Sequence, residues 1–358
     1  MSDEAIELLE LGRGDARSLG ARHAEVWGDR AAALFGVRWR LLRARSRIKR
    51  DSTLRALAEA HLPVLQAFHA PALEELEGFA QVSGLEPWQL VVLNHYTDFR
   101  DIPPESGGCS VVYAPLATGP IAAQTWDMHG TAEPFVGLLR LKRDATPRMV
   151  LFTLAGCLGM TGLNSAGVAV CINNLTPDDA RVGVVWPALV RRMLEETTAT
   201  AAVEILRGAR LGSGHNYLVA DSTTVFNVET TGTRQKVTHA EPRGWYWHTN
   251  HYLDPELKTH EQPLLPTSTS CDRYDRLAAH LGPEALHPHD VRALWQLLGS
   301  HEGYPRSLCA HLMGDDPAAS KTCGGALCDL SGRRMLARRG CLNDLPARTV
   351  EATEEENA

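Results

Sequence analysis

The sequence lacks several features that would place the protein in a familiar class. No run of eighteen apolar residues occurs, so no membrane-spanning segment is predicted. The N-terminal stretch MSDEAIELLE opens with acidic residues and contains no apolar core, which indicates that it is no secretory signal. No internal repeat is found, and the glycine-rich stretch GARLGSGHN matches neither the dinucleotide fingerprint nor the phosphate-binding loop.

Positively charged residues are also fewer than negatively charged ones. The 36 lysines and arginines are outnumbered by 43 aspartates and glutamates, which gives a net charge of −7. Proteins that bind nucleic acid gain much of their affinity by neutralising phosphates, so this balance argues against that function. The basic stretch from Arg38 to Arg50 runs against the trend, and a solvated helix face explains it better than a phosphate site. The acidic C-terminal stretch EATEEENA is predicted to stay solvated.

The eight cysteines follow no disulfide or zinc-binding pattern. They are scattered along a chain without an export signal, which favours reduced thiols and a cytoplasmic location. Cys323 and Cys328 are predicted to be small buried residues, because free cysteine is often buried. His215 and His311 belong to no histidine pair with the i, i+4 spacing of a helical zinc motif, so no metal site is predicted.

Hydrophobic periodicity divides the chain near residue 100. Before that point apolar residues recur at steps of three and four, so residues 1 to about 100 are predicted to be helical. The stretch DFRDIPPESGG is a predicted loop, because Pro103–Pro104 and Gly107–Gly108 break regular structure.

After Cys109 the pattern changes to short apolar runs bounded by turn residues: SVVYAP, GPIAAQTW, FVGLLRLK, RMVLFTLAG and GVAVCINNL. Such runs are typical of buried strands. Two helices are predicted within 186–208, the second capped by Thr198 or Thr200. Further strands follow, then helices over 271–280 and 290–298, and a hairpin that turns at Ser331–Gly332. This order predicts an α+β fold in which sheet layers are covered by helices.

The stretch GGCSVVYAPL contains the first candidate for chemistry, Cys109. As an ordinary residue it would be a buried thiol where a loop joins a strand. As a nucleophile it needs a base, because the pKa of a free thiol is about 8.5. Cleavage of the Gly108–Cys109 bond would supply an α-amino group that titrates near pH ~8 and serves as that base. Glycine at position 108 leaves room for the attack and tolerates strained dihedral angles.

Four more polar residues stand at the ends of strand-like runs or between aromatic residues. Asp127, in AAQTWDMHG, either caps a turn or orients an amino group on the neighbouring strand. Asn173 and Asn174 end GVAVCINNL, as turn residues or as oxyanion donors. Asn250 lies in GWYWHTNHYLD, where it is either part of an irregular loop or a functional amide.

The order of these motifs (GGC, TWD, GLNSAG…INNL, HNYLVAD…FNVE, HTNHY) resembles the acyl-coenzyme A:6-aminopenicillanic acid acyltransferase family of N-terminal nucleophile (Ntn) hydrolases. A more distant resemblance is to penicillin V acylases and bile salt hydrolases. The resemblance covers nearly the whole chain and rests on five motifs in order. It implies a four-layer αββα sandwich preceded by a helical leader.

The resemblance also implies self-cleavage between Gly108 and Cys109. The products would be a leader of residues 1–108 and a catalytic part of residues 109–358, which stay together as one compact unit. Cys109 would be the nucleophile and, through its new amino group, the base. Asp127 would position that amino group.

Two asparagines would stabilise the oxyanion, Asn250 through its side chain and Asn174 through its backbone N–H. Candidates for the substrate pocket are Trp126, Met128, His129, His251 and Arg306. Three further residues match family positions and are predicted to be structural supports: His215, Asp221 and Glu229.

One position departs from the family pattern. Where the family often has S-I-C-R-H, residues 307–311 read SLCAH, so Ala310 replaces an arginine expected near the nucleophile. Such an arginine would lower the pKa of the thiol. Arg306 and Arg273 are the candidates to replace it.

The sequence therefore predicts an Ntn-type acyltransferase or amide hydrolase that works through a Cys109 thioester. It predicts no cofactor, with acyl-coenzyme A as a candidate co-substrate. The predicted partners are a small amide or acyl thioester and the cleaved leader, with no nucleic acid and no membrane. Transfer or hydrolysis, the substrate and the oligomeric state stay open. The alternatives are a non-catalytic or unprocessed binding protein of the same fold, and an ordinary cytosolic domain in which Cys109 is merely buried.

Overall fold

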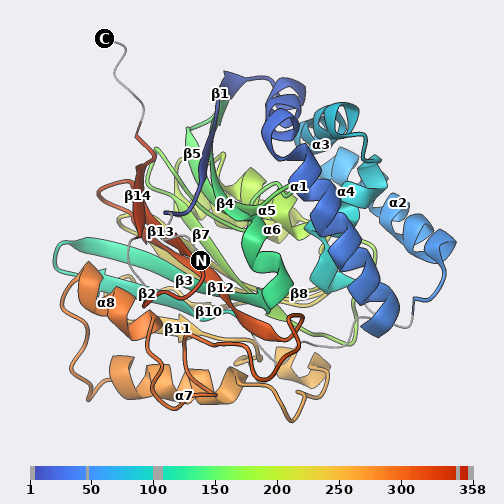
Figure 1. Cartoon of the computed structure of the whole chain (residues 1–358). Helices are drawn as coiled ribbons and strands as arrows, with labels where there is room; N and C mark the ends of the chain where they lie inside the picture. The colour runs from blue at the N-terminus through green and yellow to red at the C-terminus, as the bar shows by residue number, and fades with distance from the viewer. Residues whose placement is uncertain (1–4, 46–47, 100–107, 344–346, 354–358) are drawn as a thin grey trace.

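Two β-sheets packed face to face form the centre of the protein, and helices cover both outer faces (Figure 1). The computed structural model describes residues 5–45, 48–99, 108–343 and 347–353. The predicted α+β fold with its four αββα layers is confirmed. The predicted break at Pro103–Pro104, Gly107 and the end of the acidic tail lie outside the described residues.

The first sheet has eight strands in the order β1-β4-β5-β6-β7-β8-β9-β10. Its strands are β1 (Leu8–Gly14), β4 (Val136–Arg143), β5 (Met149–Leu154), β6 (Thr161–Asn164), β7 (Ala169–Leu175), β8 (Gly214–Ala220), β9 (Val225–Thr230) and β10 (Gln235–His239). Neighbours are antiparallel, except that β1 and β4 are parallel.

The second sheet has six antiparallel strands in the order β11-β2-β3-β12-β13-β14. Its strands are β2 (Val111–Leu116), β3 (Gly119–His129), β11 (Tyr246–His248), β12 (Ser320–Asp329), β13 (Arg334–Arg339) and β14 (Arg348–Glu351). The hairpin predicted at Ser331–Gly332 is the connection between β12 and β13. A bulge in β12 shifts the register opposite Trp126 and Asp127.

Helices lie outside both sheets. On the side of the first sheet are α1 (Ala16–Arg45), α2 (Asp51–Phe68), α3 (Ala70–Ser83), α4 (Pro87–Asn94), α5 (Trp186–Met193) and α6 (Ala199–Gly208). On the second sheet are α7 (Ser270–Leu281) and α8 (Val291–Leu298). Thr198 caps α6 as predicted, since its Oγ1 accepts the Ala201 N–H at 3.2 Å. Among the described residues, no helix has the length and apolar character to cross a membrane.

Strand β2 shows how alternate side chains serve the two interfaces. Val111 and Tyr113 belong to the core shared with the first sheet, whereas Val112 and Ala114 pack with the apolar residues of α7 and α8. A shift of one residue would exchange these two sets, so burial fixes the register strongly. That register also fixes where Cys109, two residues before the strand, lies between the sheets.

The prediction that residues 1 to about 100 are helical is wrong for the first of them. Leu8–Gly14 forms β1, which pairs in parallel with β4. Its sequence, LLELGRG, has no alternating apolar pattern, and most of its side chains are half-buried or exposed at the sheet edge. The segment before Cys109 therefore contributes to the first sheet as well as to a helical layer.

Helices α1 and α3 cross with their backbones in direct contact. A Cβ added at Gly20 would collide with the backbone of Glu75, and one added at Gly78 would collide with the backbone of Arg17. Glu75 is in turn bound by Arg191 of α5, through bonds of 3.0 and 2.7 Å from its two terminal nitrogens. The crossing thus connects α1 and α3 to the part of the chain that follows Cys109.

The substitution Gly20→Ala is expected to lower the free energy of unfolding by about 2 kcal/mol or more, because a rigid backbone would have to move. The matched control is Gly36→Ala in the same helix. There the nearest atom to a new Cβ is the end of the Arg40 side chain, at 3.8 Å. It is expected to stabilise the protein by up to about 1 kcal/mol through helix propensity. Urea unfolding measures both, and equal effects would contradict a tight crossing.

Candidate active site

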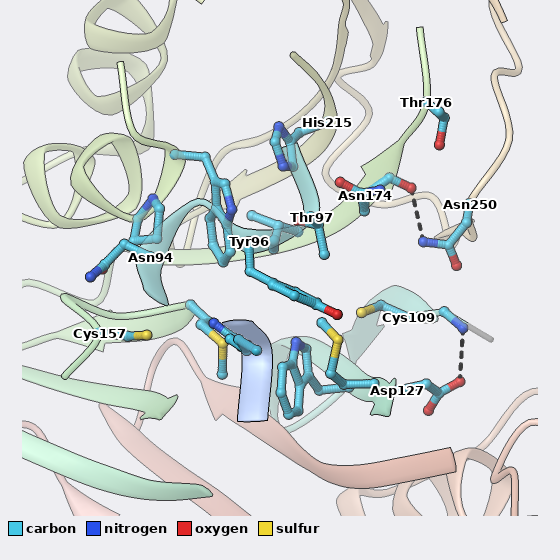
Figure 2. Close-up of a pocket in the computed structure, with 18 of the residues that line it drawn as sticks. Asn94, Tyr96, Thr97, Cys109, Asp127, Cys157, Asn174, Thr176, His215 and Asn250 are labelled. Carbon is cyan, nitrogen blue, oxygen red and sulfur yellow. Dashed lines mark hydrogen bonds between the residues drawn. The ribbon is translucent and has the colours of Figure 1, made fainter. Parts of the chain in front are cut away.

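The predicted catalytic residues meet in one pocket, at the junction of the two sheets and the leader (Figure 2). Cys109 lies two residues before β2, with 6% of its surface exposed. Asp127 is on β3, Asn174 is on β7 and Asn250 follows β11. All four line the pocket, together with Gly108. Motifs far apart in the sequence are therefore neighbours in the fold.

Gly108 is packed against the side chain of Asn250. A Cβ at position 108 would collide with the carboxamide of Asn250, so close approach explains the glycine. The backbone N–H of Gly108 is directed at the carboxylate of Asp127, 3.4 Å from Oδ2 (Figure 2).

Arg273 of α7 joins the Cys109 segment to the Asn250 loop. Its side chain is buried and 1% exposed. The guanidinium donates to the carbonyl oxygen of Cys109 at 2.8 Å, to Ser110 Oγ at 2.9 Å and to Asn250 Oδ1 at 2.8 Å. Of the two arginines that could replace the one missing at Ala310, Arg273 therefore lies in the site.

Asn250 is oriented by both its side chain and its backbone. Because Oδ1 accepts from Arg273, Nδ2 faces the other way and donates to the carbonyl oxygen of Asn174 at 2.9 Å (Figure 2). The backbone N–H of Asn250 donates to Oγ of Ser270, the first residue of α7, at 2.7 Å. An amide nitrogen carries two hydrogens, so the second N–H of Nδ2 stays available for a ligand.

The two adjacent asparagines of β7 make different contacts. Asn173 Nδ2 donates to the carbonyl oxygen of Cys109 at 2.8 Å, while its Oδ1 accepts from Asn216 at 2.9 Å. Asn174 lines the pocket, and its buried side-chain oxygen has no hydrogen-bond partner among the described residues. That the Asn174 backbone N–H binds an oxyanion stays a prediction.

Burial dominates the electrostatics of Cys109 and its neighbour Asp127. It raises the pKa of the Cys109 thiol to about 12, with a further contribution from the Asp127 charge and opposition from Arg273. Burial also raises the pKa of Asp127, from 3.8 to about 6, against the charge of Arg273 and the hydroxyl of Thr322. Thr322 Oγ1 donates to Asp127 Oδ1 at 2.7 Å from the bulged strand β12. At neutral pH the uncleaved chain thus holds a protonated thiol beside a carboxylate.

Two of the five predicted pocket residues, Trp126 and Met128, line the pocket, whereas His129, His251 and Arg306 do not. His129 is completely buried and faces Thr131 Oγ1 at 2.7 Å. His251 Nδ1 is directed away, at Ser270 Oγ. Arg306 is exposed and pairs with Asp272 at 2.8 Å.

The predicted structural supports divide into two groups. Glu229 pairs with His248 at 2.7 Å and accepts two backbone N–H groups that follow Asn250, so it braces that loop. Asp221 accepts the first backbone N–H of α6 at 2.8 Å. His215 is different, because it lines the pocket itself.

The part of the chain before Cys109 supplies several residues of the pocket wall: Arg38, Leu93, Asn94, Tyr96 and Thr97. Arg38, predicted to lie on a solvated helix face, is only 3% exposed, donates to the Leu93 carbonyl oxygen and lies over the Tyr96 ring at 4.7 Å. Its spacing from the buried Leu34 and Leu42 could have revealed this, because residues four apart share a helix face. Among the described residues, the one group of side chains close enough to share a metal ion lies outside this pocket.

The chain was compared with known families and proteins. The family model described as "Acyl-coenzyme A:6-aminopenicillanic acid acyl-transferase" matches residues 118–334, a range that begins after Cys109. A curated relative, the 40 kDa form of acyl-coenzyme A:6-aminopenicillanic-acid-acyltransferase from Emericella nidulans, is 26% identical over 274 residues, which cover 76% of this chain and 75% of the relative.

Two solved structures are similar at lower identity. Penicillin V acylase from Agrobacterium tumefaciens is 15% identical with a TM-score of 0.45, over 70% of this chain and 89% of that one. The N-acylethanolamine-hydrolyzing acid amidase ortholog from Caenorhabditis elegans is 14% identical with a TM-score of 0.39, over 62% and 93% of the two chains.

Asp127 is expected to make stability depend on pH. A carboxyl group whose pKa is higher in the folded state favours folding while protonated, so its effect is most favourable below pH 3.8 and is lost as the pH rises through about 6. The loss amounts to about 3 kcal/mol. In a Cys109→Ala background, Asp127→Asn should therefore gain stability relative to its parent between pH 4 and pH 8.

Urea unfolding of both proteins at several pH values measures this difference. The effects of other titrating groups on the free energy of unfolding are the same in parent and variant, so they cancel in the difference. A difference that does not change with pH would show that the Asp127 carboxyl is not desolvated in the uncleaved chain.

Proposed function

The chain belongs to the acyl-coenzyme A:6-aminopenicillanic acid acyltransferase family, and on that premise we propose that it is a self-processing cysteine acyltransferase or amide hydrolase with Cys109 as nucleophile. The observation that carries the proposal is the setting of the Gly108–Cys109 bond. The Gly108 N–H is directed at Asp127, Arg273 donates to the carbonyl oxygen of Cys109, and Asn250 packs against Gly108. These are the groups that an amino-terminal nucleophile needs.

Self-cleavage begins when Cys109 Sγ attacks the carbonyl carbon of Gly108. The peptide C–N bond breaks as the Cys109 nitrogen takes up the thiol proton, and a thioester joins Gly108 to Sγ. Water then hydrolyses the thioester, releasing a carboxylic acid at Gly108 and restoring the thiol. A side chain at position 108 would displace Asn250 from this site.

The new α-amino group changes the chemistry of the thiol. In the uncleaved chain burial raises the pKa of Cys109 to about 12, so few thiolates form at neutral pH. An amine that titrates near pH ~8 can accept the thiol proton directly. Asp127, which faces the preceding backbone nitrogen before cleavage, would hold the resulting ammonium group.

In turnover, Sγ attacks the carbonyl carbon of an amide or thioester. The oxyanion would accept the second N–H of Asn250 Nδ2 and the backbone N–H of Asn174. The leaving amine or thiol takes the proton from the ammonium group, and the acyl group stays on Sγ. Water or an amine then removes it and restores the thiol. Acyl-coenzyme A fits the donor role of this scheme as a co-substrate.

The cleaved leader would remain bound as part of the enzyme. It supplies strand β1 and several residues of the pocket wall, and its helices contribute to the main apolar core. The expected substrate is a small amide or acyl thioester that fits this pocket. All eight cysteines are free in the structure, which supports a reducing compartment such as the cytoplasm.

Denaturing intact-mass analysis tests self-cleavage at the proposed bond. Wild-type protein should give fragments of roughly 12 and 27 kDa, whereas Cys109→Ala should stay at 39.2 kDa. The purified protein is then incubated with acyl donors with and without an amine, and the product distinguishes transfer from hydrolysis. One uncleaved species in both samples would instead favour an unprocessed binding protein of the same fold.

The role of Arg273 can be separated from that of a nearby arginine. Arg273→Met should slow self-cleavage about a hundredfold or more, because it releases both the Cys109 carbonyl and Asn250. Arg306→Met is the matched control, since Arg306 is exposed and outside the pocket, and should cleave at the wild-type rate. Time courses by gel electrophoresis measure both, with circular dichroism to confirm folding. Slow cleavage in Arg306→Met alone would reverse the assignment.

A further inference from the structure

Two cysteines and two histidines meet outside the pocket, where the connection between α8 and β12 passes the end of β13. The side chains are His301, Cys309, His311 and Cys341. Cys309 and Cys341 have their sulfur atoms 3.7 Å apart. His301 Nε2 lies 3.3 Å from Cys341 Sγ and 2.9 Å from His311 Nε2.

These separations are close to those of ligands around one small cation. With metal–sulfur bonds of about 2.3 Å and metal–nitrogen bonds of about 2.0 Å, tetrahedral ligand atoms lie about 3.3 to 3.8 Å apart. All four ligand atoms here lie within 4.8 Å of one another. Closing the widest separation requires a ligand to move by about 1 Å, which side-chain rotation can provide.

The types of ligand select the cation. Two thiolates and two imidazoles form a set that is soft compared with carboxylates, and tetrahedral sites of two sulfurs and two nitrogens are typical of zinc. Magnesium and calcium prefer oxygen ligands and are disfavoured. Four protein ligands also leave no open position for substrate, which is typical of a structural site.

The surroundings of Cys309 fit a metal-bound thiolate. Its side chain is completely buried. A bound cation would deprotonate both thiols.

We propose that His301, Cys309, His311 and Cys341 form a structural Zn²⁺ site that fastens residues 299–319 to the end of β13. Those residues form no helix or strand between α8 and β12. A connection of this length without regular structure needs another source of order. The sequence predicted no metal site, because the ligands are spread over 41 residues without a zinc-motif spacing.

The site has a physical connection to the nucleophile. Ala310, between two of the ligands, donates its N–H to Thr322 Oγ1 at 2.8 Å and accepts the Thr322 N–H at 2.9 Å. Thr322 in turn donates to Asp127. Zinc would therefore hold in place the segment that orients the carboxylate beside Cys109.

The test is metal analysis of the full chain, purified without a histidine tag and without chelators. We expect about one zinc ion per chain by inductively coupled plasma mass spectrometry. Replacement by Co²⁺ should give the visible absorption of a tetrahedral site together with thiolate charge-transfer bands. Cys309→Ser and His301→Ala should weaken binding of the metal about tenfold or more in competition with a chromogenic chelator.

Two control substitutions match the chemistry of the ligands. Cys271 is the exposed cysteine, and His289 has a side chain that is 85% exposed. Cys271→Ser and His289→Ala should retain the full zinc content and the cobalt spectrum. If Cys309→Ser fails to fold, His301→Ala, checked by circular dichroism, decides the question.

Three results would overturn the proposal. The first is wild-type protein that holds no zinc after incubation with zinc sulfate and gel filtration. The second is a ligand variant that binds zinc as tightly as the wild type. The third is a Cys309–Cys341 disulfide in protein prepared from reducing cells. None of these readouts depends on self-cleavage or on acyl transfer, so the proposed function and the zinc site can fail separately.

Discussion

One buried cation organises the site. Arg273 is surrounded by protein, and an unpaired guanidinium there would carry a large desolvation cost. Its hydrogen bonds to Cys109, Ser110 and Asn250, together with the nearby charge of Asp127, offset that cost. Because arginine keeps its charge even when buried, these contacts persist across the pH range in which Asp127 titrates. The segment that carries Cys109 and the loop that carries Asn250 are thus bound to the same side chain.

The dependence on Arg273 explains how residues from distant segments can act together. Helix α7 brings Ser270 and Arg273 to the loop that carries Asn250, while Glu229 braces the far side of that loop. From the other direction, the leader contributes Arg38 and Tyr96 to the pocket. A break before Cys109 would therefore cut one covalent bond without dismantling the site. The packed core and the pairing of β1 with β4 would hold the two chains together.

Much of the fold could be predicted because buried strands have a strong sequence signal. Runs such as SVVYAP and RMVLFTLAG are apolar over a length that suits a strand covered on both faces, and they became β2 and β5. Strand β1 was not predicted, because it lies at the edge of the first sheet and carries polar side chains. Its place depends on parallel pairing with β4, more than a hundred residues away, which local periodicity cannot reveal.

The candidate site could likewise be predicted from the sequence only in part. Cys109, Asp127 and Asn250 stand in short motifs whose order is informative, and the structure brings them into one pocket. The replacement for an arginine at position 310 could not be chosen from spacing, because Arg306 is nearer in sequence while Arg273 is nearer in space. His301, Cys309, His311 and Cys341 present the same difficulty, since their spacing matches no motif and only the packing of a connection against β13 unites them. Sequence order thus identifies residues that one strand or loop presents, whereas partners on separate elements require the fold.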